Sequence, residues 1–238
     1  GNTTASNNTA VGYQALDNTT TGGANVAIGA HALDANTTAS DNTAVGYQAL
    51  VSNTTGASNT AVGRSSLNDN STGSNNTALG YHSLVSNTTA SNNTAVGYQT
   101  LDANTTGDGN VGVGNHALGA NTTGGTNVAV GMNCLDANTE GDHNTGLGYG
   151  ALGTATTGDS NTAIGYEALK SVTTADNNTA LGNKAGDALT DGHSCVFIGQ
   201  LSDADNGSRV GAVALGYGIG THPANNTFRV IGSGGVYH

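Results

Sequence analysis

The sequence has no tryptophan, one proline, two cysteines and only five lysine or arginine residues among its 238 residues. Aromatic residues make up 4% of the chain, which excludes a wide core built from large side chains. Sixteen acidic residues against five basic ones give a net charge of −11, so no basic surface is available to neutralise phosphates. We therefore expect no nucleic-acid partner, and a thin body in which small residues let backbones approach closely.

Long hydrophobic runs are also missing. No apolar run approaches the roughly 18–20 residues that a membrane-spanning helix needs, so we expect no membrane insertion by this segment.

What the sequence has instead is a repeat. Glycine recurs every seventeen residues from Gly12 to Gly216 without a slip, and an aliphatic residue always precedes it. Positions are counted from this glycine as position 0, which places Val45 at −1, Gly46 at 0 and Leu50 at +4. Fixed-period self-similarity on this scale predicts a solenoid in which each repeat stacks on the last. Disorder would also fit the low charge, but it gives no reason to hold an aliphatic column in register.

The residues before the glycine alternate between β-branched or aliphatic residues and Ala or Gly, the period of two that predicts a strand. Leucine follows at position +4 in ten consecutive repeats, from Leu16 to Leu169. Burying one leucine contributes about 1.5–3 kcal/mol, so this column is expected to carry much of the stability. The predicted core comprises Val45, Gly46, Leu50, Val62, Leu67, Leu84, Val96, Leu101, Leu118, Leu135, Leu152 and Leu169.

The rest of each repeat is polar. Asn53-Thr54-Thr55-Gly56 is typical of a corner, since Asn and Gly tolerate positive φ. Asparagine fills position −4 in eleven successive repeats, where stacked amides can form a hydrogen-bonded ladder. We expect each repeat to form one coil with two short strands and two turns. The predicted fold is an all-β parallel β-solenoid, or β-roll, of thirteen 17-residue coils.

The pattern loosens near the C-terminus. Residues 1–185 are regular, whereas residues 186–238 are expected to form divergent coils and a cap or a transition to another module. Glycine replaces leucine at Gly186, larger apolar residues enter at 196–198, and residues 226–231 have the pattern of a conventional strand. Candidates for a cap or a tip contact are Phe197, Arg209, His222, Phe228 and Arg229.

The unit Thr-Ala-Val-Gly-Tyr-Gln-Ala-Leu at 43–50 resembles the short repeat of YadA-like heads in trimeric autotransporter adhesins. Similar arrays occur in phage and bacterial fibres. The resemblance covers about residues 1–218 and implies a left-handed β-roll, a parallel homotrimer, and an extracellular location on a bacterial surface or virion. A host-surface glycan or protein would then be the partner. The seventeen-residue coil is about three residues longer than is usual in the family, and the extra length falls in the Asn-Thr-Thr corner.

No convincing catalytic pair, cofactor motif or metal motif is present, so we expect no enzyme. His31, His82 and His116 share position +2 and would form metal-binding rings if that face lined a threefold axis, but the position also holds Gln, Ser, Lys and Glu. Cys134 and Cys195 lie about three and a half repeats apart, or roughly 17 Å in stacked strands, which is too far for a disulfide.

Three functions remain open at this stage. The first is a non-enzymatic structural or adhesive fibre segment with a repetitive polar surface. An ice-binding solenoid is the alternative, although adjacent threonines such as Thr54 and Thr55 would point to opposite sides of a strand. A glycan-cleaving tailspike is the third, and it would need a carboxylate pair in a groove.

Overall fold

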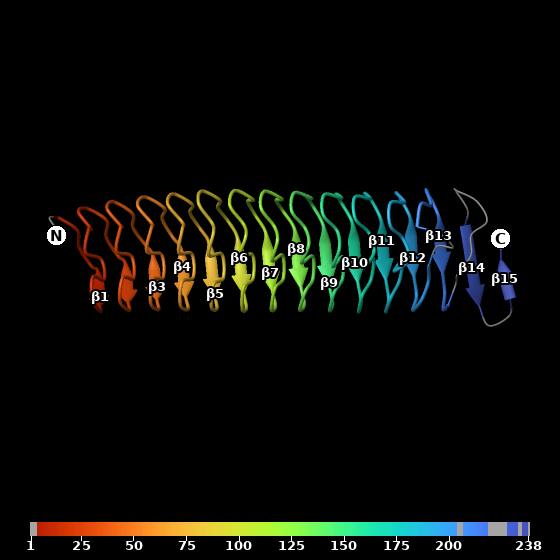
Figure 1. Ribbon diagram of the computed structural model, residues 1–238, viewed down its shortest axis with the longest axis horizontal. Helices are drawn as coiled ribbons and strands as arrows, with labels where there is room; N and C mark the ends of the chain where they lie inside the picture. The colour runs from red at the N-terminus through yellow and green to blue at the C-terminus, as the bar shows by residue number, and fades with distance from the viewer. Residues whose placement is uncertain (1–3, 204–206, 219–227, 233–234, 238) are drawn as a thin grey trace. The chain divides into compact units, whose positions relative to one another are not determined.

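The computed structural model describes residues 4–203, 207–218, 228–232 and 235–237, and all the regular elements there are β-strands. The chain divides into two compact units, residues 1–123 and residues 124–238, and each is a stack of coils (Figure 1). Among the described residues, none forms a helix long and apolar enough to span a bilayer. The predicted parallel β-solenoid is confirmed within each unit.

In the first unit, each coil contributes one three-residue strand that pairs in parallel with the strand one repeat away. Thr43 lies opposite Thr60, Ala44 opposite Ala61 and Val45 opposite Val62, a shift of one full repeat. The strands are β1 (Thr9–Val11), β2 (Val26–Ile28), β3 (Thr43–Val45), β4 (Thr60–Val62), β5 (Thr77–Leu79), β6 (Thr94–Val96) and β7 (Val111–Val113).

The second unit has its own strands paired one repeat apart, and near its end the pairing changes. Its parallel strands are β8 (Val128–Val130), β9 (Thr145–Leu147), β10 (Thr162–Ile164), β11 (Thr179–Leu181), β12 (Val196–Ile198) and β13 (Val213–Leu215). β14 (Phe228–Gly232) pairs in parallel with β13, and β15 (Gly235–Tyr237) pairs antiparallel with β14. Because β12 and β13 keep the repeat register, the change after residue 186 is at first one of composition rather than of architecture.

The expectation of two strands per coil was wrong for the described residues, where each repeat contributes one. After the glycine, the remainder of the coil turns repeatedly because three further positions adopt positive φ. These are positions +2, +4 and +12, represented by Gln48 at 56°, Leu50 at 52° and Ser58 at 59°. Left-handed residues interrupt any second extended run. For leucine this conformation costs about 1–2 kcal/mol, which its burial offsets.

The glycine at position 0 has a steric cause. Gly46 has a φ of 140°, and a Cβ built on it would lie 2.4 Å from the carbonyl oxygen of Gly63 in the next coil. Both the backbone conformation and the close contact therefore require glycine. The same contact recurs along each unit, so it explains the unbroken glycine column.

The interior is filled by leucine at position +4 and alanine at position −2. The predicted core leucines are fully buried in both units: Leu50, Leu67, Leu84, Leu101, Leu118, Leu135, Leu152 and Leu169. Four predicted core residues are not in the buried core. Val45, Val62 and Val96 lie half-buried on the outer face of their strands, and Gly46 is half-buried as well. Beyond the first coil, it is Ala44 and the other alanines at position −2 that point inward, at 0% exposure.

Two columns of buried asparagine join the coils. At position −4, the Asn25 Oδ1 accepts the backbone N–H of Asn42 at 2.9 Å, while its Nδ2 donates to the carbonyl of Ala39 at 2.9 Å. The expected amide-to-amide bonds at this position occur in the second unit, where Asn161 Nδ2 donates to Asn144 Oδ1 at 3.1 Å. The asparagines therefore serve mainly as caps for backbone groups.

A continuous amide ladder runs instead through position +7 of the first unit. Asn70 Nδ2 donates to Asn53 Oδ1 at 2.9 Å, and Asn87 Nδ2 donates to Asn70 Oδ1 at 2.8 Å. Each Nδ2 also reaches a carbonyl three residues on, as Asn70 does with Gly73 at 3.0 Å. Buried amides with both groups satisfied fix the register of the corner.

The break in the leucine column is repaired by an aromatic residue. A Cβ on Gly186 would lie 2.8 Å from Cδ2 of Phe197 and 2.7 Å from Cδ2 of Leu169. Phe197 is fully buried and takes the space that a leucine at 186 would fill. A large residue at position −2 thus compensates for a missing one at position +4.

The steric account of position 0 predicts that alanine is destabilising at Gly131 and tolerated at Gly150, both in the second unit. Gly131→Ala would place its Cβ 2.5 Å from the Gly148 carbonyl oxygen at a φ of 138°. We expect a destabilisation of roughly 3 kcal/mol, seen as a lower melting temperature by circular dichroism.

The matched control is Gly150→Ala, whose Cβ would meet only the Glu167 Cγ, at 3.6 Å. We expect it to change stability by less than about 1 kcal/mol. Equal melting temperatures for the two variants would contradict the proposed role of the glycine column.

Candidate functional site

The outer strand face carries an exposed aliphatic row at position −1. Its members include Val11, exposed by 59%, and Leu79, exposed by 47%, in the first unit, and Leu147, exposed by 46%, in the second. Threonine or valine at position −3 lies beside this row. Monomeric soluble proteins rarely expose large contiguous apolar patches, so this face has the composition of an interaction surface.

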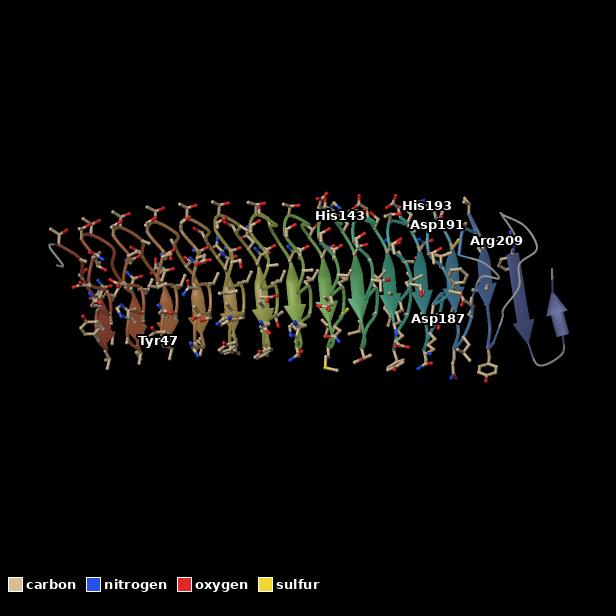
Figure 2. The ribbon with its side chains drawn as sticks, in the orientation of Figure 1. Tyr47, His143, Asp187, Asp191, His193 and Arg209 are labelled. Carbon is tan, nitrogen blue, oxygen red and sulfur yellow. The ribbon has the colours of Figure 1, made fainter. Side chains whose placement is uncertain are left out.

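An aromatic row borders the strands at position +1. Tyr81 and Tyr98 stack with ring centroids 5.3 Å apart, and the Arg64 guanidinium lies 5.9 Å and 5.8 Å from the Tyr47 and Tyr81 ring centroids. Figure 2 labels Tyr47 within this row. Stacking between coils holds these amphipathic rings in place.

The histidines at position +2 each have local partners. His31 Nδ1 lies 3.1 Å from Asp34 Oδ2, His82 stacks on Tyr81 with centroids 4.0 Å apart, and His116 packs against Tyr98. They lie on three different coils of the first unit, at the same position of each. In the described part of the chain, no group of three or more His, Cys, Asp or Glu side chains is arranged to hold a metal ion.

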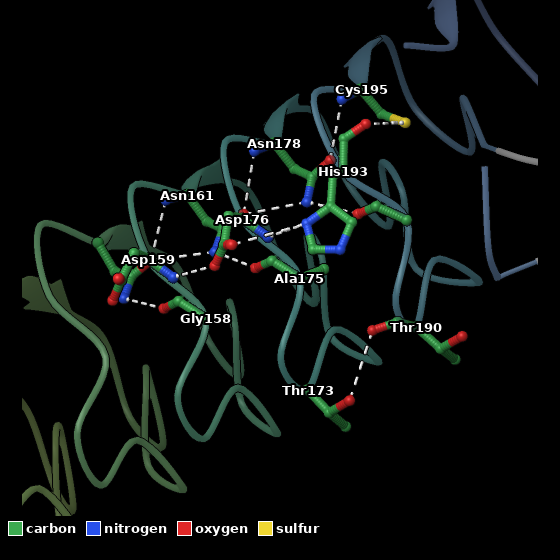
Figure 3. Close-up of polar contacts among 12 residues, drawn as sticks. Gly158, Asp159, Asn161, Thr173, Ala175, Asp176, Asn178, Thr190, His193 and Cys195 are labelled. Carbon is green, nitrogen blue, oxygen red and sulfur yellow. Dashed lines mark hydrogen bonds and ion pairs between the residues drawn. The ribbon is translucent and has the colours of Figure 1, made fainter. Parts of the chain in front are cut away.

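A corner column at position +11 carries Asp142, Asp159, Asp176 and His193 in the second unit. Asp142 N–H donates to Asp159 Oδ1 at 2.7 Å. Asp159 N–H donates to Asp176 Oδ1 at 2.7 Å, and Asp176 N–H donates to His193 Nδ1 at 2.9 Å (Figure 3). Each side chain therefore caps the backbone of the preceding coil. In the first unit, serines serve the same purpose, as when Ser74 Oγ accepts from Ala57 N–H at 3.0 Å.

An ion-pair network occupies another edge of the second unit. Glu167 accepts from Lys170 Nζ at 2.6 Å and lies 3.4 Å from Lys184 Nζ. The hydrogen bond from Lys170 is the main reason that the pKa of Glu167 is lowered, and the same bond raises the pKa of Lys170. Because the folded-state pKa of Glu167 is depressed, this stabilisation holds at neutral pH and is lost as the pH falls through that pKa.

Both cysteines are free and buried. Burial raises the pKa of the Cys134 thiol to about 12 and also raises the pKa of Cys195. Because the thiolate is the reactive form, both side chains behave as small core groups.

The predicted tip residues that the structure describes differ in their surroundings. Phe197 belongs to the core, and Arg209 is half-buried with its carbonyl accepting a hydrogen bond from Cys195 Sγ at 3.2 Å. Phe228 opens β14 and is 57% exposed, whereas the Arg229 backbone pairs with Ala214. The Arg229 side chain and all of His222 lie outside the described residues.

The fold defines the chain as a β-solenoid repeat protein. No family model matches the sequence, and comparisons with curated proteins and with solved structures found no significant match. Any assignment of function therefore depends on the surfaces described above.

At position +11, the effect of the aspartate charge on stability can be separated from the effect of its hydrogen bond to the backbone. Asp159→Ser keeps an oxygen that can accept from Asp142 N–H, as serines do in the first unit, and it removes a charge between two like charges. We expect stability to rise by about 0.5 kcal/mol at low salt and the gain to shrink at high salt.

Asp159→Ala loses the acceptor as well as the charge, so we expect it to be about 1 kcal/mol less stable than the serine variant. Thermal melts at two salt concentrations measure both effects. A serine variant less stable than the alanine variant would contradict the capping role.

Proposed function

We propose that this chain is a non-enzymatic structural segment of an extracellular fibre, and that copies pack side by side as a parallel homotrimer. The observation that carries the proposal is the exposed aliphatic row at position −1, flanked by Thr or Val on the outer strand face. Covering this row removes apolar surface from water, at about 25 cal/mol per Å². Closed threefold symmetry would give each chain the same covered flank.

The proposed contact between chains uses the aliphatic row at position −1 and not the small alanine residues at position −2. Alanine at position −2 is buried inside each coil, so an alanine column cannot be the contact between chains. Valine, isoleucine and leucine at position −1 are available for that contact. They are spaced one coil apart, which suits the interdigitation of identical rows.

The corners would remain outside such an assembly and present the adhesive or spacer surface. Their side chains repeat every seventeen residues, so a host-surface glycan or protein would meet many similar sites. The resemblance of residues 43–50 to adhesin head repeats supports the same function and a location on a bacterial surface or virion.

Ice binding and glycan cleavage have less support. At position +8 the Thr54 hydroxyl donates to the Ser71 carbonyl at 3.0 Å, so this threonine row is engaged by the backbone and does not form a two-row threonine face with position +9. Glu167 is held ionised by lysines and is therefore unsuited to be a general acid at neutral pH.

Light scattering tests the assembly. We expect a mass of about three times the 23.3 kDa chain for the wild type. The double variant Val45→Lys, Val62→Lys places two charges in the aliphatic row, and we expect it to dissociate towards monomers.

A charge-matched control is Thr38→Lys, Thr55→Lys, which alters the exposed corner of the same unit and should remain trimeric. Circular dichroism establishes that all variants keep the β-solenoid. A monomeric wild type, or equal dissociation of both double variants, would refute the proposed assembly.

A further inference from the structure

One coil of the second unit lacks two side chains that other coils carry on their outer edge. Gly150 at position +2 and Gly153 at position +5 occupy places where other coils carry residues such as Gln48 and Val51. In the sequence from Gly12 to Gly216, no other repeat has glycine at both positions. The edge concerned is the one where Asp187, another position +5 residue, is labelled in Figure 2, opposite His143 and His193.

The missing side chains leave a cavity of about 190 Å³ between the neighbouring coils. Asn133 and Asp136, at positions +2 and +5 of the preceding coil, line one side. Glu167 and Lys170, at the same positions of the following coil, line the other, and Tyr149 borders the cavity at position +1. The cavity is thus flanked by polar pairs from two coils, with glycine backbone between them.

The backbone does not require glycine at position 150. Gly150 has a φ of 60°, and non-glycine residues adopt the same conformation at this position, including Gln48 at 56° and His82 at 55°. A Cβ on Gly150 would make only an ordinary contact with Glu167 Cγ, at 3.6 Å. The fold therefore accepts a longer side chain here, and the open space is a property of this coil's sequence.

The lining contains charges of both signs and neutral groups that donate and accept hydrogen bonds. Glu167 is bound by Lys170 and Lys184, and each ammonium group has three N–H donors. Asn133 adds a carboxamide and Tyr149 a phenol. A phosphate would face the carboxylates of Asp136 and Glu167, and a metal cation would face Lys170, so ions of either sign are disfavoured.

A neutral, polyhydroxylated ring suits such a lining, because every hydroxyl both donates and accepts. We propose that this cavity binds one pyranose ring of a glycan without cleaving it. The inference rests on the proposed adhesive function, for which it names the ligand class. The cavity is built from positions +1 to +6, so covering the strand rows at positions −3 and −1 in a trimer leaves it open.

Saturation-transfer NMR on the full chain tests the proposal, with the methyl glycosides of glucose, galactose, mannose and N-acetylglucosamine as probes. We expect saturation transfer to at least one glycoside with a Kd on the order of 1 mM, because a single sugar has few atoms. Gly150→Gln places the side chain used at Gln48 into the cavity and should weaken binding at least tenfold, about 1.4 kcal/mol.

His116→Gln introduces the same residue at position +2 of another coil and should bind like the wild type. Lys170→Met keeps the length of the stem but removes the N–H donors, and should also weaken binding. Melting curves establish that each variant is folded, and Gly150→Ala serves as a smaller obstruction if the glutamine variant is unstable.

Absence of saturation transfer to all four glycosides, or equal transfer by wild type and Gly150→Gln, would overturn the inference. Light scattering on the same samples separates the two proposals. A trimer that binds no glycoside refutes the sugar site alone. A monomer that binds a glycoside, and loses that binding in the Gly150→Gln variant, refutes the assembly alone.

Discussion

The close contact between the position 0 glycine of one coil and the glycine carbonyl of the next is the constraint on which the rest depends. With the Gly46 Cα this near the Gly63 carbonyl, every strand must pair in register one full repeat away. The same spacing stacks Leu50, the position −4 amides and the position +7 amides into columns. An insertion anywhere in a coil would misalign all of these at once, which accounts for the unbroken seventeen-residue period.

The period, the strand position and the leucine core could be predicted from the sequence, because each depends only on spacing and on alternation. Which face of each strand points into the interior could not be predicted. Val45 was expected in the core. The interior is already filled by Leu50 and the asparagine columns, so only alanine fits there and valine is left outside. Competition for a narrow interior thus reverses the usual inference from hydrophobicity.

The surface features were harder to predict because they arise between coils. Gly150 and Gly153 are two of 38 glycines in the chain, and they define a cavity only when Asn133 and Glu167 are known to lie on either side. Phe197 stood out as unusual, yet its use as a replacement for the leucine missing at Gly186 depends on stacking. The aspartate column could have been found from its shared position with serine, since both offer an oxygen to the same backbone N–H.

The central claim is that the row at position −1 is covered by neighbouring copies, and cysteine accessibility tests it most directly. Cys134 and Cys195 are buried, so labelling by a maleimide reports on an introduced thiol. In the assembled protein, Val62→Cys should be labelled much more slowly than Thr72→Cys at the exposed corner, although Val62 is half-exposed in a single chain. Equal labelling rates at the two positions would show that the aliphatic row faces water, and would contradict the account.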